Sequence, residues 1–487
     1  MSARFLLGEA ALAAGAEVMR AGSATDLRGV FTDTRAPAQG GLFVALRGER
    51  YDGSAFVLEA VRGGAAAVLV PRASIASVQA ALAETPVAVL AAQDTGRALL
   101  NLARAWRGQM ANLRCVCITG SAGKTSTKEL VAQVLSASAP TLKTEGNLNN
   151  EIGVPLTLLQ LEAAHRFAVI ECGMNHLGEI ARLASAADPD LALVTNVGPV
   201  HLEGCGSLDG VAQAKGELFH ALRSDGVAIA NADDPRVLAQ AVLSGRKRLT
   251  FGAQASADVQ LVSAHHGGAG LQIALRFGSQ GQAFETHSLE LQLLGVHNGL
   301  NAAAAAAVGL ALGLDTGTIV KGLAQARTPG RRMRPVQLES GALLIDDCYN
   351  ANPSSTKAAL VTLSQLASGR QGEPGLGRSI AVLGDMLELG PTELDLHRDV
   401  GRFAAGTGLA RLICFGARAR TIGEGAIEAG LDAAKVKLTD DPAEAARSAR
   451  GAGLSAGDTI LVKGSRGMKM ERISDALSGS AAAPGGH

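Results

Sequence analysis

Short apolar runs recur along most of the chain and alternate with longer segments of mixed polarity. In the middle third, apolar runs at 167–171, 191–195 and 227–230 are separated by segments in which apolar residues have helical spacing. Continuous apolar runs are typical of strands buried on both faces, and helices between such strands favour a largely parallel sheet that is covered on both sides. The pattern therefore predicts an α/β fold.

The same pattern divides the chain into three predicted domains. Residues 1–91 contain the short runs of a small N-terminal α/β domain. Residues 92–327 carry the strand–helix alternation, and from about 257 to 294 apolar and polar positions alternate, which predicts an antiparallel appendage on a central parallel sheet. Residues 328–487 restart the strand–helix alternation and predict a C-terminal Rossmann-like domain.

Two segments are predicted to connect or end these domains. Thr328–Arg332 contains Pro and Gly and is expected to be a hinge between the second and third domains. Residues 478–487 are rich in Gly, Ala and Ser and are expected to form a disordered tail.

Composition narrows the class of protein. The chain has 487 residues, is 47% hydrophobic and 18% charged, and its 45 basic and 45 acidic residues give a formal net charge of zero. That balance disfavours a nucleic-acid-binding protein or a partner of anionic membranes. Six scattered cysteines, several in apolar runs, predict reduced and mostly buried thiols in a cytoplasmic protein. We expect no signal peptide and no membrane span, because no apolar run has the required length.

A candidate phosphate site follows the apolar run that ends at Thr119. A glycine-rich turn, Gly120–Gly123, precedes Lys124 and Thr125, which open a predicted helix. Glycines let backbone N–H groups approach a phosphate, a lysine can reach the β- and γ-phosphates, and the threonine hydroxyl can bind Mg²⁺. Ile118 stands where the general P-loop has glycine, so the motif is a shortened form. We predict nucleotide binding here, against the alternative of a chance turn before a helix.

Three side chains follow the ends of predicted strands in the same region. Glu171 ends one strand, where a carboxylate would face the phosphates and complete a Mg²⁺ shell; the alternative is a surface carboxylate. His201 follows another strand end, and by itself a hydrogen-bonded loop histidine is the favoured interpretation. Lys215 lies on the next predicted helix, where a solvated lysine is the favoured interpretation.

Amides and acids gather in three further segments. Residues 146–155 are dense in amides, which can recognise uncharged polar groups or form a turn-rich loop. Asn298 opens an Ala-rich helix and could cap it or contact a base edge. Residues 346–353 end a strand with two acids followed by amides, which suits ribose hydroxyls or Asx-turn chemistry.

Together these segments resemble the Mur ligase family, which joins peptide units to UDP-N-acetylmuramic acid with ATP. The resemblance covers about residues 30–475 and rests first on Thr119–Thr125 followed by Glu171, His201 and Lys215 in that order. Within the family, four segments resemble the ligase that adds D-alanyl-D-alanine to UDP-N-acetylmuramoyl-tripeptide: 146–155, 171–179, 346–353 and 462–466. The ligase that adds the third residue carries an Asp-Asn-Pro-Arg motif that this chain lacks, and folylpolyglutamate synthetases lack a front domain.

The resemblance implies an acyl-phosphate mechanism in cytoplasmic peptidoglycan precursor synthesis. ATP would phosphorylate the terminal carboxylate of the tripeptide, and the amine of D-alanyl-D-alanine would attack the product. The implied partners are these two substrates, without nucleic acid or membrane, and the implied state is a monomer. The third tripeptide residue, meso-diaminopimelate or L-lysine, stays open.

The resemblance also assigns roles to individual residues. Catalysis would depend on Lys124, Glu171, His201 and Lys215. One Mg²⁺ ion would be held by Thr125 and Glu171, and a second by His201 and a carbamylated Lys215. ATP would be bound by Gly120, Ser121, Ala122, Gly123, Lys124, Thr125, Ser126, Asn298, Asn301, Arg331, Asp347 and Asn350.

Substrate contacts are spread over all three predicted domains. The uridine diphosphate part would be bound by Thr32, Asp33, Thr34 and Arg35, and the muramoyl-peptide by Asn149, Asn150, Asn175 and His176. The peptide or dipeptide would meet His397, Lys463, Ser465 and Arg466. Ser54 stands where family members usually have His, which weakens the case for a contact from that loop. A P-loop binding or regulatory ATPase without ligation is the competing class, and the acids and amides of the outer domains disfavour it.

Overall fold

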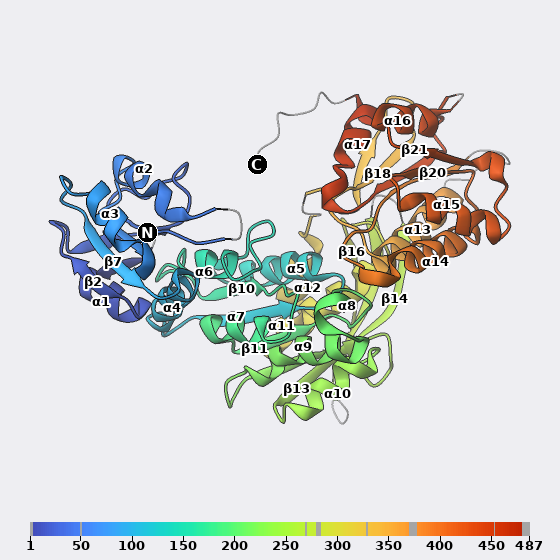
Figure 1. Cartoon of the computed structure of the whole chain (residues 1–487). Coiled ribbons are helices and arrows are strands. Elements are labelled where there is room, and N and C mark those ends of the chain that lie inside the picture. The colour runs from blue at the N-terminus through green and yellow to red at the C-terminus, as the bar shows by residue number, and fades with distance from the viewer. Residues whose placement is uncertain are drawn as a thin grey trace.

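The computed structural model describes residues 3–48, 51–267, 270–278, 284–327, 330–369, 377–451 and 453–479. Figure 1 shows an N-terminal body and a C-terminal body on opposite sides of a central body. Both outer sheets are mixed and mostly parallel, and in all three bodies helices pack against the sheet. The predicted three-part α/β architecture is confirmed. Part of the predicted hinge, Thr328 and Pro329, and most of the predicted tail, 480–487, lie outside the described residues.

The N-terminal body contains a sheet of order β2-β7-β6-β5-β4 and a small antiparallel pair, β1 with β3. A helix, α4, follows the sheet and leads into the central body. The elements of the N-terminal body and the helix that follows it are β1 Arg4–Leu6, α1 Leu7–Ala14, β2 Glu17–Arg20, β3 Asp26–Arg28, β4 Val30–Phe31, β5 Leu42–Val44, α2 Val57–Arg62, β6 Ala67–Pro71, α3 Ile75–Ala81, β7 Ala88–Ala92 and α4 Thr95–Gly108.

The central sheet has the order β16-β15-β14-β13-β12-β11-β8-β10-β9. Its elements are β8 Arg114–Thr119, α5 Lys124–Ser136, β9 Thr141–Lys143, α6 Gly153–Leu158, β10 Phe167–Glu171, α7 Glu179–Ala187, β11 Leu191–Val194, α8 Leu202–Cys205, α9 Leu208–His220, β12 Val227–Asn231, α10 Pro235–Leu243, β13 Lys247–Gly252, β14 Val259–Gly267, β15 Gly270–Phe277, β16 Glu285–Leu291, α11 His297–Ala311 and α12 Thr316–Ala324.

The predicted antiparallel segment is present, but it continues the central sheet rather than standing apart from it. β14 pairs with β13 in parallel, through Phe251 with Val259, and β14, β15 and β16 then pair antiparallel. β13 is therefore not an edge strand, because β14 pairs with it. The alternation of apolar and polar positions along the sequence does not reveal this pairing.

The C-terminal sheet has the order β17-β18-β22-β19-β20-β21 and is parallel except for β17. Its elements are β17 Arg334–Gln337, β18 Leu343–Asp347, α13 Pro353–Gly369, β19 Ser379–Gly384, α14 Glu393–Ala405, β20 Arg411–Phe415, α15 Ala419–Glu428, β21 Val436–Thr439, α16 Pro442–Arg450, β22 Thr459–Lys463 and α17 Glu471–Ser478.

Helices cover both faces of the central sheet, as predicted. Along β8, Cys115 and Cys117 pack into the core shared with α4, α7 and α9, whereas Val116 and Ile118 pack into the core shared with α5, α11 and α12. Small side chains make the second face tight: a Cβ on Gly322 would lie 2.6 Å from Val134 Cα. Ala and Gly thus let helices pack closely in a chain with 3% aromatic residues.

All six cysteines are free and buried, as predicted. Within the described residues, no helix has the length and apolarity needed to cross a membrane. The predicted domain boundaries fall at the end of β7 and after α12, and they stay predictions.

Candidate active site

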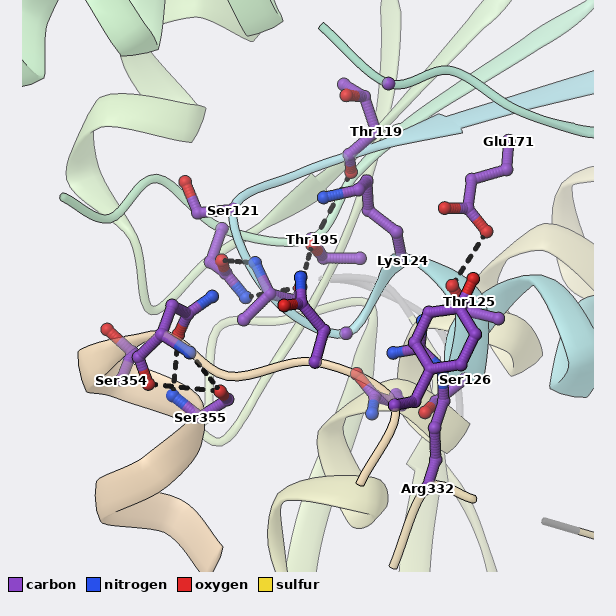
Figure 2. A pocket seen from close by; sticks show the side chains of 18 of the residues that line it. Thr119, Ser121, Lys124, Thr125, Ser126, Glu171, Thr195, Arg332, Ser354 and Ser355 are labelled. Carbon is purple, nitrogen blue, oxygen red and sulfur yellow. Dashed lines mark hydrogen bonds between the residues drawn. The ribbon is translucent and has the colours of Figure 1, made fainter. Parts of the chain in front are cut away.

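A deep cavity lies where the carboxyl ends of the central strands meet the C-terminal body. It has a volume of about 610 Å³ and is lined by the P-loop, by the ends of β10, β11 and β12, by the start of α11 and by the loop after β18. Figure 2 shows Thr125 and Glu171 pointing toward one another, and Ser354 and Ser355 of α13 across from Ser121. Ligands in open α/β sheets bind at this edge.

The P-loop needs glycine at two positions. A Cβ on Gly120 would lie 1.8 Å from Thr195 Oγ1, and one on Gly123 would lie 2.7 Å from Asn301 Oδ1; both glycines have positive φ. Lys124 Nζ donates to Gly120 O at 2.7 Å, so the ammonium lies over the loop. Burial lowers the pKa of Lys124, and the charge of Arg332 adds to that effect while Glu171 opposes it.

Residues at the end of β11 hold the shape of this loop. Asn196 accepts from Ala122 N at 2.9 Å and donates to Ala122 O at 3.0 Å, and Thr195 Oγ1 donates to the same oxygen at 2.6 Å. Gly198 N donates to Ser121 Oγ at 2.7 Å. Sequence reasoning missed Asn196, although its place directly after a strand end was a usable signal.

Glu171 joins the P-loop to the amide-rich loop. Thr125 Oγ1 donates to Glu171 Oε2 at 2.9 Å, and Asn149 Nδ2 donates to Oε1 at 2.8 Å. Glu171 is 2% exposed. The surface-carboxylate alternative for Glu171 is therefore wrong. Asn150 and Asn175 line the same cavity.

His201 and Lys215 both line the cavity. Lys215 is 1% exposed, so the solvated-lysine alternative is wrong. Burial lowers its pKa well below the usual value, and the nearby charge of Lys124 lowers it further. Among the described residues, no group accepts a hydrogen bond from Lys215 Nζ. His201 has φ 54°, and burial, followed by the charges of Lys124 and Lys215, lowers its pKa to about 4.

Two asparagines at the start of α11 form a hydrogen-bonded chain. Asn298 Nδ2 donates to Leu294 O at 2.7 Å, and Asn301 Nδ2 donates to Asn298 Oδ1 at 2.8 Å. Both line the cavity and are buried. The N-cap position belongs to Val296, without a side-chain cap, so the capping interpretation of Asn298 is wrong.

The C-terminal body contributes a lysine–aspartate pair to the cavity. Lys463 Nζ lies 2.6 Å from Asp347 Oδ2 and donates to Asn350 O at 2.9 Å. Arg466 also lines the cavity. Ser465 is buried behind it, where its hydroxyl donates to Ala351 O at 3.3 Å.

Two residues predicted to contact ATP or substrate lie outside the cavity lining. Arg331 does not line the cavity, because its guanidinium is paired with Asp346 at 3.0 Å and Asp475 at 2.7 Å. Its neighbour Arg332 lines the cavity instead and lies 4.0 Å from the ring centroid of Tyr349. The sequence offered the arginine pair, but only the packing determines which member faces the cavity.

His397 is the second of these residues. It is fully buried outside the cavity lining, and both ring nitrogens are used: Met386 N donates to Nε2 at 2.9 Å, and Nδ1 lies 2.6 Å from Glu393 O. Burial lowers its pKa, so the neutral ring fits these contacts. These hydrogen bonds hold the loop after β19, and the substrate contact of His397 stays a prediction.

Other predicted substrate residues lie away from the cavity lining. His176 is exposed, with Nδ1 3.0 Å from Glu179 Oε1. Thr32–Arg35 follow β4 in the N-terminal body, which Figure 1 places across the central body from the C-terminal one. There Arg35 pairs with Asp33 at 2.7 Å, and hydrogen bonds from Arg35 lower the pKa of Asp33 to about 2. Thr34 Oγ1 donates to Glu59 at 2.7 Å.

Comparison with known proteins decides the family. Models of the Mur ligase family catalytic domain, the Mur ligase middle domain and the Mur ligase glutamate ligase domain match residues 26–111, 118–309 and 331–466. The UDP-N-acetylmuramoyl-tripeptide–D-alanyl-D-alanine ligase of Escherichia coli (strain K12) is 39% identical over 466 residues, which covers 94% of this chain and 95% of that protein. The chain belongs to the Mur ligase family.

Two solved Mur ligase structures are similar over nearly their whole length. A crystal structure of MurF from Acinetobacter baumannii has a TM-score of 0.85 and 32% identity, and covers 98% of this chain and 99% of its own. The MurF ligase of Thermotoga maritima in complex with ADP has a TM-score of 0.79 and 26% identity, and covers 93% and 97%. The resemblance drawn from the motifs is confirmed.

Proposed function

We propose that this Mur ligase is an ATP-dependent enzyme that adds D-alanyl-D-alanine to UDP-N-acetylmuramoyl-tripeptide, releasing ADP and phosphate, in cytoplasmic peptidoglycan precursor synthesis. The observation that carries the proposal is the single cavity in which the P-loop, Glu171, His201 and Lys215 face the C-terminal body. The printed activity of the Escherichia coli relative supports the substrates. We also propose a monomer with domains 1–91, 92–327 and 328–487.

ATP fits the central side of the cavity. The P-loop backbone and Lys124 would gather the phosphates, with Ser126 beside them and Asn298, Asn301, Asp347 and Asn350 on the adenosine side. Arg332, rather than Arg331, faces this region. The ADP bound in the Thermotoga maritima relative supports a nucleotide here.

The oxygen atoms of Thr125 and Glu171 fit a Mg²⁺ ion. They lie 2.9 Å apart, and two adjacent ligands of an octahedral Mg²⁺ ion at its usual bond length are also about 2.9 Å apart. In the described residues no three His, Cys, Asp or Glu side chains gather as a protein-only metal site. That agrees with Mg²⁺ shared between a few side chains and substrate phosphates, where it would neutralise phosphate charge.

Lys215 suits conversion to a carbamate. Burial lowers its pKa and so favours the neutral amine, whose nitrogen can attack CO₂ to give R–NH–COO⁻ with release of one proton. The product is an anion beside His201, whose low pKa keeps its imidazole neutral. We propose that these two side chains would hold a second Mg²⁺ ion.

The reaction then needs two steps at one place. A carboxylate oxygen of the tripeptide attacks the γ-phosphorus, and the bond from that phosphorus to ADP breaks. The neutral amine nitrogen of the dipeptide attacks the acyl carbon, and the tetrahedral intermediate expels phosphate as the C–O bond breaks. The nitrogen gives up one proton to water and keeps the other as the amide N–H. Lys124 offsets the repulsion between the two anions that meet in the first step.

Substrate positions outside this centre are part of the proposal. Asn149, Asn150 and Asn175 would guide the muramoyl-peptide, with His176 at the exposed edge of that path. Thr32–Arg35 would hold the uridine diphosphate part in the N-terminal domain, and Lys463, Ser465 and Arg466 belong to the peptide side.

Phosphate release tests this proposal against a P-loop ATPase without ligation. Release should require both UDP-N-acetylmuramoyl-tripeptide and D-alanyl-D-alanine and should equal the ligated product, measured by mass spectrometry. Release that is independent of the dipeptide, with no ligated product, would favour the ATPase. Parallel assays with the meso-diaminopimelate and L-lysine tripeptides would identify the third residue.

A further inference from the structure

Glu388, in the loop after β19, is a carboxylate without a role in the reaction as proposed. It lines the cavity, and its side chain is exposed. Its φ is 65°, in the left-handed region that residues with a Cβ seldom adopt. Among the described residues, no group donates a hydrogen bond to its carboxylate or forms an ion pair with it. Strained residues that persist tend to lie where a ligand is held.

The loop around Glu388 is fixed from both sides. Leu387 N donates to Ser465 Oγ at 2.9 Å, and Met386 N donates to His397 Nε2 at 2.9 Å. Leu389 is 3% exposed and packs in the domain core. These contacts hold the backbone in its strained conformation and present the carboxylate to the cavity.

Arg466 presents the opposite charge from the neighbouring loop. A Cβ on Gly467 would lie 3.0 Å from Leu387 Cδ1, so the two loops touch here. Arg466 precedes Gly467 and Glu388 follows Leu387, so the two charged residues lie on the same wall of the cavity. The Arg466 side chain is 63% exposed, 3.8 Å from Glu471 Oε1.

Two other cations of the C-terminal body are already paired. Lys463 lies 2.6 Å from Asp347, and Arg418 lies 2.6 Å from Glu393. The loop also touches the central domain near His201, because a Cβ on Gly390 would lie 3.8 Å from Glu203 Cβ. Glu388 is therefore an uncompensated carboxylate close to the junction where the nucleophile must arrive.

We propose that Glu388 binds the ammonium group of the incoming dipeptide and that Arg466 binds its carboxylate. This inference rests on the proposed function and names the residues that select a zwitterionic nucleophile. A two-residue extended chain spans about 7 Å, a length suited to two charges on one wall. Guanidinium groups pair with carboxylates through two parallel hydrogen bonds, and an unpaired carboxylate favours a cation. The contact with Glu388 places the nitrogen before it attacks the acyl carbon and assigns no proton transfer.

Steady-state kinetics of Glu388→Gln test the ammonium contact. With ATP and UDP-N-acetylmuramoyl-tripeptide saturating, the KM for D-alanyl-D-alanine should rise about 10- to 100-fold, the range for losing a hydrogen bond to a charged group. The KM for ATP should stay unchanged. Glu339→Gln is the matched control, because Glu339 is exposed, lies outside the cavity lining and belongs to the same domain.

A ligand without the ammonium separates binding from general damage. N-acetyl-D-alanyl-D-alanine should inhibit the wild type and Glu388→Gln equally, because it cannot use the carboxylate. Glu388→Gly separates charge from strain: glycine adopts positive φ freely, so its melting temperature should not fall, yet its KM for the dipeptide should match that of Glu388→Gln.

A wild-type KM for the dipeptide in Glu388→Gln would overturn the inference, as would an equal rise in the KM for ATP. A wild-type enzyme that does not ligate the dipeptide would overturn the proposed function instead.

Discussion

Lys215 is buried beside a second lysine, and both face the cavity that we assign to ATP. A free ammonium there would repel Mg²⁺ and Lys124; at ~4 Å and an effective dielectric constant near 20, each unit-charge repulsion is on the order of 4 kcal/mol. The pKa of Lys215 is lowered for the same reason, because burial and the charge of Lys124 both disfavour the cation. A carbamate removes the conflict by reversing the sign of the charge.

Substitution of Lys215 tests the carbamate. Lys215→Ala should lower the ligation rate by at least about 100-fold, the lower end for removing one preorganised electrostatic group. Acetate or formate should restore part of the activity, because the missing group is an anion. Lys321→Ala is the control, since Lys321 is an exposed lysine on α12. Normal ligation by Lys215→Ala would refute the carbamate.

Lys124 should matter for rate and little for folding. Its one described hydrogen bond is to Gly120 O, so Lys124→Ala should keep a near-normal melting temperature. Ligation should fall by about 10²- to 10⁴-fold, because the cation that offsets phosphate charge is gone. A folded variant with near-normal ligation would contradict the P-loop assignment.

Sequence-based prediction succeeded for residues whose position in the fold depends on local spacing. Gly120, Lys124 and Thr125 follow a strand and open a helix, so their placement was readable. The direction of Arg331 was not, because it depends on Asp475, far along the chain. Glu388 was missed for a similar reason, since its strain arises from contacts made by the folded loop.

At the level of elements, buried strands could be read and edge strands could not. β10 has its predicted bounds, Phe167–Glu171, because it is a central strand. All of its residues are apolar except Glu171, which is the last. Short edge strands such as β2, β9 and β17 carry polar residues, so the sequence shows no continuous apolar run at these positions. The pairing of β14 with β13 requires partners that alternation along one segment cannot specify.

The joint between the starts of β19 and β22 predicts a pH dependence of stability. Asp458 is fully buried, which opposes its ionisation, but hydrogen bonds from Arg378 and Ser455 outweigh burial and lower its pKa from 3.8 to about 2. The folded pKa is below the unfolded value, so this contribution is present above pH ~4 and is lost as pH falls toward ~2. It is on the order of 2 kcal/mol.

Denaturant unfolding of the wild type and Asp458→Asn between pH 6 and pH 3 measures this contribution. The difference in the free energy of unfolding should be largest at pH 6 and should shrink toward pH 3. A difference that is constant across the range would contradict the assigned pKa.

At the level of the whole molecule, the proposed substrate residues are dispersed. Thr32–Arg35 lie in the N-terminal body, and Arg466 lies in the C-terminal body, on opposite sides of the central one (Figure 1). The sequence predicted the three bodies but not their arrangement, because each core can form without specifying its neighbours. The tripeptide substrate would extend from the N-terminal body to the central cavity, and the C-terminal body would hold the dipeptide, so we expect the outer domains to move toward that cavity.

We expect small-angle scattering to show compaction when ATP analogue, tripeptide substrate and dipeptide are added together. The pivot is expected between Arg327, which bridges to Gln292 of the central domain, and Arg331, whose backbone accepts from Tyr349 N at 3.1 Å. Identical scattering with and without all ligands would contradict closure, and each ligand alone serves as the control.

The fate of the tripeptide carboxylate oxygen tests acyl-phosphate ligation most directly. UDP-N-acetylmuramoyl-tripeptide labelled with ¹⁸O in its terminal carboxylate would be ligated to D-alanyl-D-alanine in unlabelled water, and the released phosphate analysed by mass spectrometry. The account predicts one carboxylate oxygen transferred to phosphate for each dipeptide joined. Ligation that releases phosphate without the label would contradict it.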